Sequence, residues 1–269
     1  MMDVLQVEYA DGIALVRLNR PEARNALNPE LIVALAECWP RLRDDGDVRV
    51  VVLTGAAGST FCAGFDLTGF IPLLTGARAP ADDWDRAVVD DPGLPALATL
   101  REFDLGCPLI VAANGHAIAG GMEMLLAGDL RVVASGARLG LSEVKLGLIP
   151  AMGGTARLAR LVSPALAAEM LLTGNPIDAD AALAAGLVNY VVGADKVEDV
   201  AVELAATIAA NAPLAVKAAR RIMRQSVDLS EAEALALESA ETDIIAQTED
   251  AQEGPRAFME KRAPVFKGR

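Results

Sequence analysis

The most hydrophobic long stretch of the chain, residues 108–130, is interrupted by polar residues and by four glycines. Because Glu123 lies inside it, the stretch lacks the roughly 20 uninterrupted apolar residues that a bilayer helix requires. Short apolar runs at 109–113 and 130–134 predict two strands, with a helix beginning near Gly120 between them. The sequence therefore predicts an α/β core and no membrane-spanning segment.

Two glutamates occupy apolar, glycine-marked surroundings. Glu123 lies within 118–127, and Glu143 follows 139–142 and precedes the Gly153-Gly154 pair. A carboxylate in such a setting is costly unless it is paired or its pKa is raised. Because acids in such settings are often catalytic, both glutamates are candidate catalytic residues.

The length and composition predict one large domain, or a core with an appendage. The chain has 269 residues, and single α/β domains reach about 250 residues. Hydrophobic residues make up 53% of the chain but aromatic residues only 4%, so the core should consist mainly of small aliphatic side chains. Surplus apolar surface favours burial between subunits, and we expect a homo-oligomer.

The N-terminal region predicts a hairpin followed by a helix and a buried strand, because Asp11-Gly12 is a strong hairpin signal and Asn28 precedes Pro29 as a helix cap would. We expect strands at 4–9, 13–19 and 48–53 and a helix at 29–43. From Ser163 onward, helix signals dominate. Capping residues are expected at Ser163, at Asp178, and at Ser230 with Glu233.

Residues 68–95 read as an irregular, acidic surface segment or lid, rich in proline and glycine. This composition offers little apolar burial. We therefore expect the segment to become ordered when a ligand binds.

Two loops that follow predicted strands, 60–67 and 113–121, can turn backbone amides towards a ligand, because glycine permits the required backbone angles and a close approach. Two amides that converge on one oxygen form an oxyanion hole, which stabilises developing negative charge.

Together with the two glutamates, these segments resemble the crotonase, or enoyl-CoA hydratase/isomerase, superfamily. The matching segments, in the family's order, are 18–27, 61–66, 114–123, 143–154, 172–174 with 182–188, and 253–262. The resemblance covers nearly the whole chain. It implies an α/β fold with a crotonase-like spiral of ββα turns over 1–195, and a helical C-terminal trimerisation region over 196–269. The implied assembly is a trimer or a dimer of trimers.

The resemblance also implies a coenzyme A (CoA) thioester substrate and residue roles. The amides of Phe65 and Gly120 would hold the thioester oxygen, Glu123 would activate water for attack at C3, and Glu143 would protonate C2. The implied reaction is the hydration of a trans-2-enoyl-CoA to a 3-hydroxyacyl-CoA, with fatty-acid β-oxidation as its setting. The alternatives are an enoyl-CoA delta-isomerase, another crotonase-type reaction, or an inactive acyl-CoA binding protein.

In similar proteins the coenzyme lies along three regions, which match the turn at 24–27, the loop at 63–67 and the C-terminal region here. The positions that match here are Arg24, Ala26, Leu27, Ala63, Asp66, Leu67, Phe258 and Lys261. Basic residues gather at the first and last of these regions, although the net charge is −13. Phe65, Ser142 and Ala151 depart from the residues common in hydratases, which bears on substrate choice more than on mechanism.

We expect no prosthetic group, since coenzyme A is part of the substrate. We expect no metal, because the chain has one histidine, His116, and three cysteines without metal-ligand spacing, which we take for core thiols. A net charge of −13 argues against nucleic-acid binding. The first seven residues show no targeting signal, so the expected location is cytoplasmic.

Overall fold

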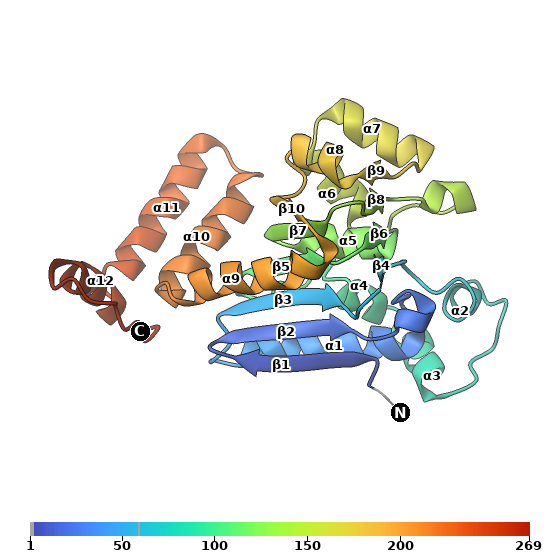
Figure 1. The fold of residues 1–269 in the computed structure, drawn as a ribbon, viewed down its shortest axis with the longest axis horizontal. Helices are drawn as coiled ribbons and strands as arrows, with labels where there is room; N and C mark the ends of the chain where they lie inside the picture. The colour runs from blue at the N-terminus through green and yellow to red at the C-terminus, as the bar shows by residue number, and fades with distance from the viewer. Residues whose placement is uncertain (1–2, 59) are drawn as a thin grey trace.

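The computed structural model describes residues 3–58 and 60–269, and it places two sheets beside a set of helices (Figure 1). The six-stranded sheet contains β1 (Leu5–Ala10), β2 (Ile13–Leu18), β3 (Val50–Gly55), β5 (Leu109–Ala113), β7 (Leu130–Ala134) and β10 (Tyr190–Val192), in that order. The four-stranded sheet contains β4 (Thr60–Cys62), β6 (His116–Ile118), β8 (Arg138–Gly140) and β9 (Ile177–Asp178).

The helices of the first two-thirds of the chain are α1 (Pro29–Asp44), α2 (Ile71–Leu74), α3 (Asp83–Asp90), α4 (Leu94–Ala98), α5 (Gly120–Ala127), α6 (Gly154–Leu161), α7 (Pro164–Thr173) and α8 (Ala179–Ala184). Those of the last third are α9 (Val197–Ala209), α10 (Pro213–Ser226), α11 (Glu231–Ile245) and α12 (Glu249–Met259). Short 3₁₀ helices are η1 (Pro21–Ala23), η2 (Glu143–Leu146) and η3 (Ala194–Lys196).

The centre of the fold is a spiral in which successive strand pairs feed both sheets. In each of the pairs β3/β4, β5/β6 and β7/β8, the first strand joins the larger sheet and the second joins the smaller sheet. Neighbours from successive pairs run parallel in both sheets, and each pair is followed by helix. The expected spiral of ββα turns is thus confirmed, and every residue of β3 and β5 is buried, as parallel strands covered on both faces should be.

The local signals at the predicted helix starts are confirmed. The side chain of Asn28 accepts a hydrogen bond from the amide of Leu31, and Ser230 forms a reciprocal capping box with Glu233. The side chains of Ser163 and Asp178 cap α7 and α8 by accepting a hydrogen bond from a backbone amide three residues later, as Asn28 does. The three cysteines are buried free thiols, as expected.

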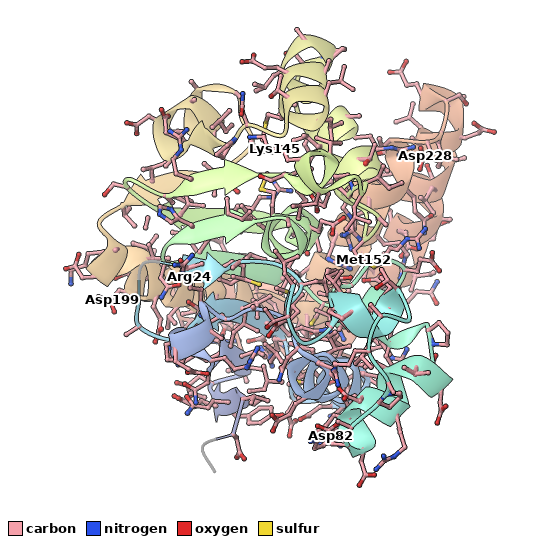
Figure 2. The ribbon with its side chains drawn as sticks, turned by 90° about the vertical axis from the view of Figure 1, so that its right-hand side faces the viewer. Arg24, Asp82, Lys145, Met152, Asp199 and Asp228 are labelled. Carbon is pink, nitrogen blue, oxygen red and sulfur yellow. The ribbon has the colours of Figure 1, made fainter. Side chains whose placement is uncertain are left out.

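The expectation that residues 68–95 lack apolar burial is wrong. This segment contains α2 and α3 and the start of α4, and the side chains of Phe70, Leu73 and Val88 are part of the hydrophobic core. The carboxylate of Asp85, also buried, accepts a hydrogen bond of 2.9 Å from Arg78 Nη2. These anchors fix the segment without a ligand, so our reason for expecting ligand-induced ordering does not hold. Figure 2 views the molecule from the side of this segment, with Asp82 at the start of α3.

The first helix of the C-terminal region covers the larger sheet. α9 packs on β3, β5 and β7 through buried residues that include Val197, Ala201 and Ala205. A division between 1–195 and 196–269 therefore separates a helix from the sheet that it covers. Where the chain divides into domains stays a prediction.

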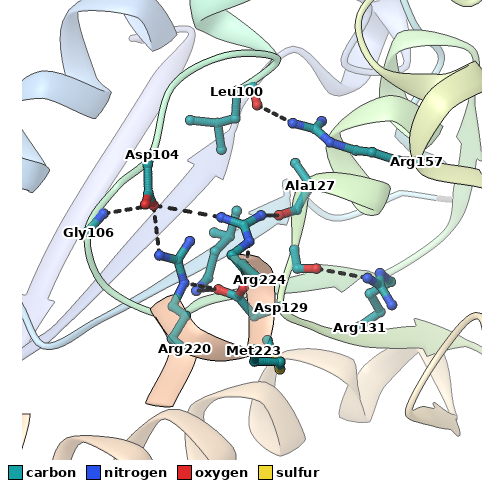
Figure 3. A network of polar contacts seen from close by, with 12 residues as sticks. Leu100, Asp104, Gly106, Ala127, Asp129, Arg131, Arg157, Arg220, Met223 and Arg224 are labelled. Atoms are coloured by element: carbon teal, nitrogen blue, oxygen red, sulfur yellow. Dashed lines mark hydrogen bonds and ion pairs between the residues drawn. The ribbon is translucent and has the colours of Figure 1, made fainter. Parts of the chain in front are cut away.

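α10 is tied to the body by a buried ion pair between Arg220 and Asp129 and by a second pair with Asp104, whose side chain is exposed (Figure 3). Arg220 donates from Nε to Asp129 Oδ2 and from Nη1 to Asp104 Oδ1, both over 2.7 Å. Arg224 donates to the carbonyl of Ala127, at the end of α5, over 3.2 Å. α11 and α12 then extend away from the sheets (Figure 1).

These last helices expose large apolar side chains, namely Met223, Val227, Leu235, Ile244, Phe258 and Met259. Such a surface is typical of a protein interface. No single helix of the described residues is long and apolar enough to cross a membrane, and α9 with α10 meets the length and composition criteria only as a pair bent by 110°.

Candidate active site

One pocket of about 380 Å³ contains both candidate catalytic glutamates, Glu123 and Glu143. Its walls come from the β4 loop, α2, the start of α4, the β6–α5 turn and the segment after β8. Most of its lining is apolar. The volume falls in the range of about 300–1,000 Å³ that is usual for ligand sites.

Glu123 is held in a defined position on α5. Its side chain is buried, and Oε1 accepts hydrogen bonds from the amides of Met152 at 2.7 Å and Gly154 at 2.9 Å. A Cβ at position 154 would lie 2.9 Å from this oxygen, so glycine is required for the second bond. Burial raises the pKa of Glu123, and the two amides counteract this by stabilising the carboxylate.

Glu143 begins η2 and faces the same pocket in a different environment. Its buried Oε2 has no hydrogen-bond partner in the described part of the chain. Burial, with a smaller contribution from the negative charge of Glu123, raises the pKa of Glu143 to about 7. Burial thus raises the pKa of both carboxyl groups, but two amides offset this effect at Glu123, whereas the buried Oε2 of Glu143 has no partner in the described part of the chain. Two such environments suit a base and an acid that act together.

The backbone amides predicted to form an oxyanion hole lie against each other. A Cβ at Gly64 would be only 3.0 Å from the amide nitrogen of Gly120, which places the Gly64-Phe65 and Ala119-Gly120 turns in contact. Within residues 3–58 and 60–269, neither the Phe65 amide nor the Gly120 amide donates a hydrogen bond to a protein group. Both amides are therefore available to a ligand oxygen.

The backbone at this position is strained. Ala119 has φ 51° and ψ −123°, a conformation that side chains larger than glycine rarely adopt, and it lines the pocket just before Gly120. Such strain costs on the order of 1–3 kcal/mol and is concentrated at functional sites. It sets the direction of the Gly120 amide.

Arg157 is a positioning residue that sequence reasoning missed. It lies on α6, and its Nη2 donates to the carbonyl of Leu100 at 2.6 Å (Figure 3) and to that of Arg101 at 3.0 Å. The guanidinium also packs against Gly153, beside the amides that hold Glu123. Its positive charge lowers the pKa of Glu123. In the sequence, the only feature that could have indicated this role is that Arg157 lies in the first helical turn after the Gly153-Gly154 pair.

The two N-terminal segments predicted to hold coenzyme A are joined side by side. The amide of Leu27 donates to the carbonyl of Gly64 at 2.8 Å, and the amide of Ala63 donates to the carbonyl of Arg24 at 3.1 Å. Ala63 and Leu67 line the pocket. Ala26 lies in the same turn as Arg24, which is exposed and seen from the same side as Met152 in Figure 2.

Asp66 has a local structural role. Its Oδ1 accepts hydrogen bonds from the amides of Thr68 at 2.9 Å and Gly69 at 2.8 Å, which closes the turn before α2. Asp66 Oδ2 also lies 3.7 Å from Arg20.

Phe258 and Lys261 do not join the pocket of their own chain. Phe258 is near the end of α12 with 86% of its surface exposed, and Lys261 follows the helix. In Figure 1, α12 lies at the opposite end of the molecule from α2, which lines the pocket. A role of these two residues in binding coenzyme A stays a prediction, and by their position it would have to be at another subunit.

Comparisons with known proteins agree with this geometry. The sequence matches the enoyl-CoA hydratase/isomerase family over residues 8–269. It is 38% identical over 262 residues to an (E)-benzylidenesuccinyl-CoA hydratase of Thauera aromatica, covering 97% of this chain and 98% of the relative. It is 39% identical over 268 residues to a 2,3-dehydroadipyl-CoA hydratase of Escherichia coli K12, with both chains fully covered. A crystal structure of an enoyl-CoA hydratase from Mycobacterium tuberculosis H37Rv superposes with a TM-score of 0.87 at 38% identity, covering 99% of this chain and 100% of the other.

Proposed function

The chain belongs to the enoyl-CoA hydratase/isomerase family, and we propose that it adds water reversibly to a trans-2-enoyl-CoA to give a 3-hydroxyacyl-CoA. The observation that carries this proposal is the pair of carboxyl groups in one pocket, one that accepts hydrogen bonds from two backbone amides and one whose buried oxygen has no partner in the described part of the chain. A role in fatty-acid β-oxidation stays a prediction.

Hydration needs a base for water and an acid for C2, and the two glutamates of the pocket are suited to these roles. Both hydrogen bonds from backbone amides to Glu123 end on Oε1. Its Oε2 is therefore left to orient and deprotonate a water for attack at C3. Glu143 then donates its proton to C2. The amides of Phe65 and Gly120 stabilise the enolate-like charge that develops on the thioester oxygen between these steps.

The pKa of Glu143 predicts the same pH dependence for both directions of the reaction. The active enzyme holds one proton on the two carboxyl groups, on Glu143 before hydration and on Glu123 before dehydration. Because the addition of water neither takes up nor releases a proton, the equilibrium constant does not vary with pH, and kcat/KM must follow one profile in both directions. As the proton of the pair is lost, kcat/KM should fall as pH rises above about 7. Initial rates across this range check the assignment, and a kcat/KM that stays constant above pH 7 would contradict it.

A crotonyl-CoA absorbance assay tests the proposed reaction directly. Loss of the conjugated enoyl absorbance with formation of 3-hydroxybutyryl-CoA supports hydration. Conversion of a 3-enoyl-CoA to a 2-enoyl-CoA without hydration would replace the proposal with an isomerase. Tight acyl-CoA binding with no turnover of either compound would identify an inactive binding protein.

We also propose a homotrimer, or a dimer of trimers, assembled through the exposed apolar side chains of α10–α12. In such an assembly, Phe258 and Lys261 of one subunit would reach the coenzyme of a neighbour, since they do not reach their own pocket. Multi-angle light scattering gives the assembly, and shortening the chain after α9 should abolish it.

Lys261→Glu should therefore weaken the binding of coenzyme A and raise KM, more at low salt than at high salt. An exposed phosphate contact is screened over about 8 Å at physiological ionic strength. Titration calorimetry with free coenzyme A at two salt concentrations measures the effect, and Lys196→Glu, an exposed lysine that pairs with Asp199, is the control. Equal affinities for Lys261→Glu and wild type at low salt would refute the role.

A further inference from the structure

The distal part of the catalytic pocket is built from large aliphatic and aromatic side chains. Leu74, Leu146 and Ile149 line the pocket although each is exposed, at 66%, 58% and 72% respectively. Scattered exposed apolar side chains are ordinary, but several around one cavity indicate a surface that an apolar ligand covers. Further in, the stacked rings of Phe65 and Phe70, 5.1 Å apart, form an apolar wall.

The same pocket offers no positive charge to a ligand. In the described part of the chain, its only charged lining residues are Glu123 and Glu143, and no lysine or arginine lines it. The cations whose charge acts on Glu123, Arg157 and Arg101, lie outside the lining. Arg157 donates to the carbonyls of Leu100 and Arg101, and Arg101 lies 3.5 Å from Glu102. Lys145, next to the lining residue Leu146, donates to Asn175 at 2.7 Å. A second carboxylate on the acyl group would lie against apolar side chains without gaining a cationic partner.

We propose that the acyl group carried by the coenzyme is an uncharged hydrocarbon, aliphatic or aromatic, whose far end lies between α2 and the η2 segment. This inference rests on the proposed function for the position of the thioester. It separates the chain from a similar protein named for a dicarboxylic acyl-CoA, the 2,3-dehydroadipyl-CoA hydratase, despite 39% identity. We assign Leu74 as a residue that determines which acyl groups bind, because it lies on α2 at the exposed end of the pocket.

The test compares two compounds that differ only in a terminal carboxylate. Titration calorimetry of the wild-type protein with the saturated thioesters hexanoyl-CoA and adipyl-CoA measures affinity without any reaction. We expect hexanoyl-CoA to bind at least about 10-fold more tightly, because the adipyl carboxylate would lie among apolar side chains without a cationic partner. Equal affinity, or tighter binding of adipyl-CoA, would overturn the proposal.

A variant then tests the location of the acyl end. Leu74→Arg should reverse part of the discrimination, raising the affinity for adipyl-CoA and lowering that for hexanoyl-CoA. Leu74→Met keeps an apolar side chain and is the control, which should retain the wild-type ratio. Because Leu74 is exposed, neither change should prevent folding, and an unchanged ratio in Leu74→Arg would overturn the placement on α2.

Turnover separates this inference from the proposed reaction. Hydration of 2-hexenoyl-CoA in strong preference to 2,3-dehydroadipyl-CoA supports both. If hexanoyl-CoA binds tightly but neither enoyl compound is hydrated, the reaction fails while the acyl class stands. A series that ends in cinnamoyl-CoA distinguishes an aromatic from an aliphatic acyl group by its kcat/KM.

Discussion

Glu123→Gln and Glu143→Gln should each lower kcat by about 10²–10⁴-fold, the range typical of lost general acid–base catalysis, while the protein still folds and binds acyl-CoA. Glutamine preserves the shape of each side chain. At position 123 its carbonyl oxygen can still accept from the amides of Met152 and Gly154, so the geometry of α5 should persist. Glu102→Gln, at an exposed side chain, is the control and should leave kcat unchanged.

Steady-state kinetics with crotonyl-CoA measures the loss, and calorimetry with a saturated acyl-CoA confirms that binding remains. The double variant should lose much less than the product of the single losses, because residues that act in one step are not additive. Near-normal turnover of Glu143→Gln, in a protein that does hydrate enoyl-CoA, would remove Glu143 from the mechanism.

Stability gives an independent check on Glu143. Its pKa is about 7 in the folded protein against an ordinary value of 4.5, so the folded state binds the proton more tightly than the unfolded state. The resulting stabilisation is complete below pH 4.5 and is lost as pH rises through 7. Above pH 7, Glu143→Gln should therefore be at least as stable as wild type by chemical denaturation.

Much of the fold could be predicted because its signals are local. Asn28, Ser163 and Ser230 cap helices through bonds to residues within the same turn, and the strands are short apolar runs next to glycine. The spiral itself was not visible as a sequence repeat. Its ββα turns differ in length, since α2–α4 separate β4 from β5 whereas α5 alone separates β6 from β7.

The lid was misread because composition does not record which faces pack. Its prolines and aspartates suggested exposure, yet Phe70 and Val88 reach the core and Asp85 is neutralised by Arg78 from the same segment. The candidate catalytic glutamates were easier to find, because a carboxylate in an apolar stretch is conspicuous. Arg157 was not, since its significance depends on packing against Gly153, which only the fold supplies.

Gly121→Ala should disable the oxyanion hole. A Cβ at this position would lie 2.2 Å from the carbonyl oxygen of Cys62, far inside the 3.0 Å below which real contacts essentially never occur. The neighbour is backbone of β4, which cannot rotate away. The start of α5 must therefore shift from β4 and carry the amide of Gly120 away from that of Phe65.

Because removal of one oxyanion donor costs about 10²–10³-fold in kcat, we expect at least about a 100-fold loss, together with a destabilisation of about 1–3 kcal/mol from overpacking. Gly46→Ala is the matched control, since a Cβ there meets nothing within 4 Å. Thermal melts establish that the variant is folded at the assay temperature. A folded Gly121→Ala protein with wild-type kcat would show that α5 can move without affecting the hole.

The infrared stretch of the bound thioester carbonyl separates this effect from the loss of an acid or base. Hydrogen bonds from the two amides polarise the carbonyl and lower its stretching frequency. This shift depends on the backbone and not on the carboxyl groups of Glu123 and Glu143. Glu123→Gln and Glu143→Gln should keep the lowered frequency although they are slow. Gly121→Ala should return the frequency towards that of the free thioester. If all three variants keep the lowered frequency, the amides of Phe65 and Gly120 are not held in place by the packing of Gly121 on β4.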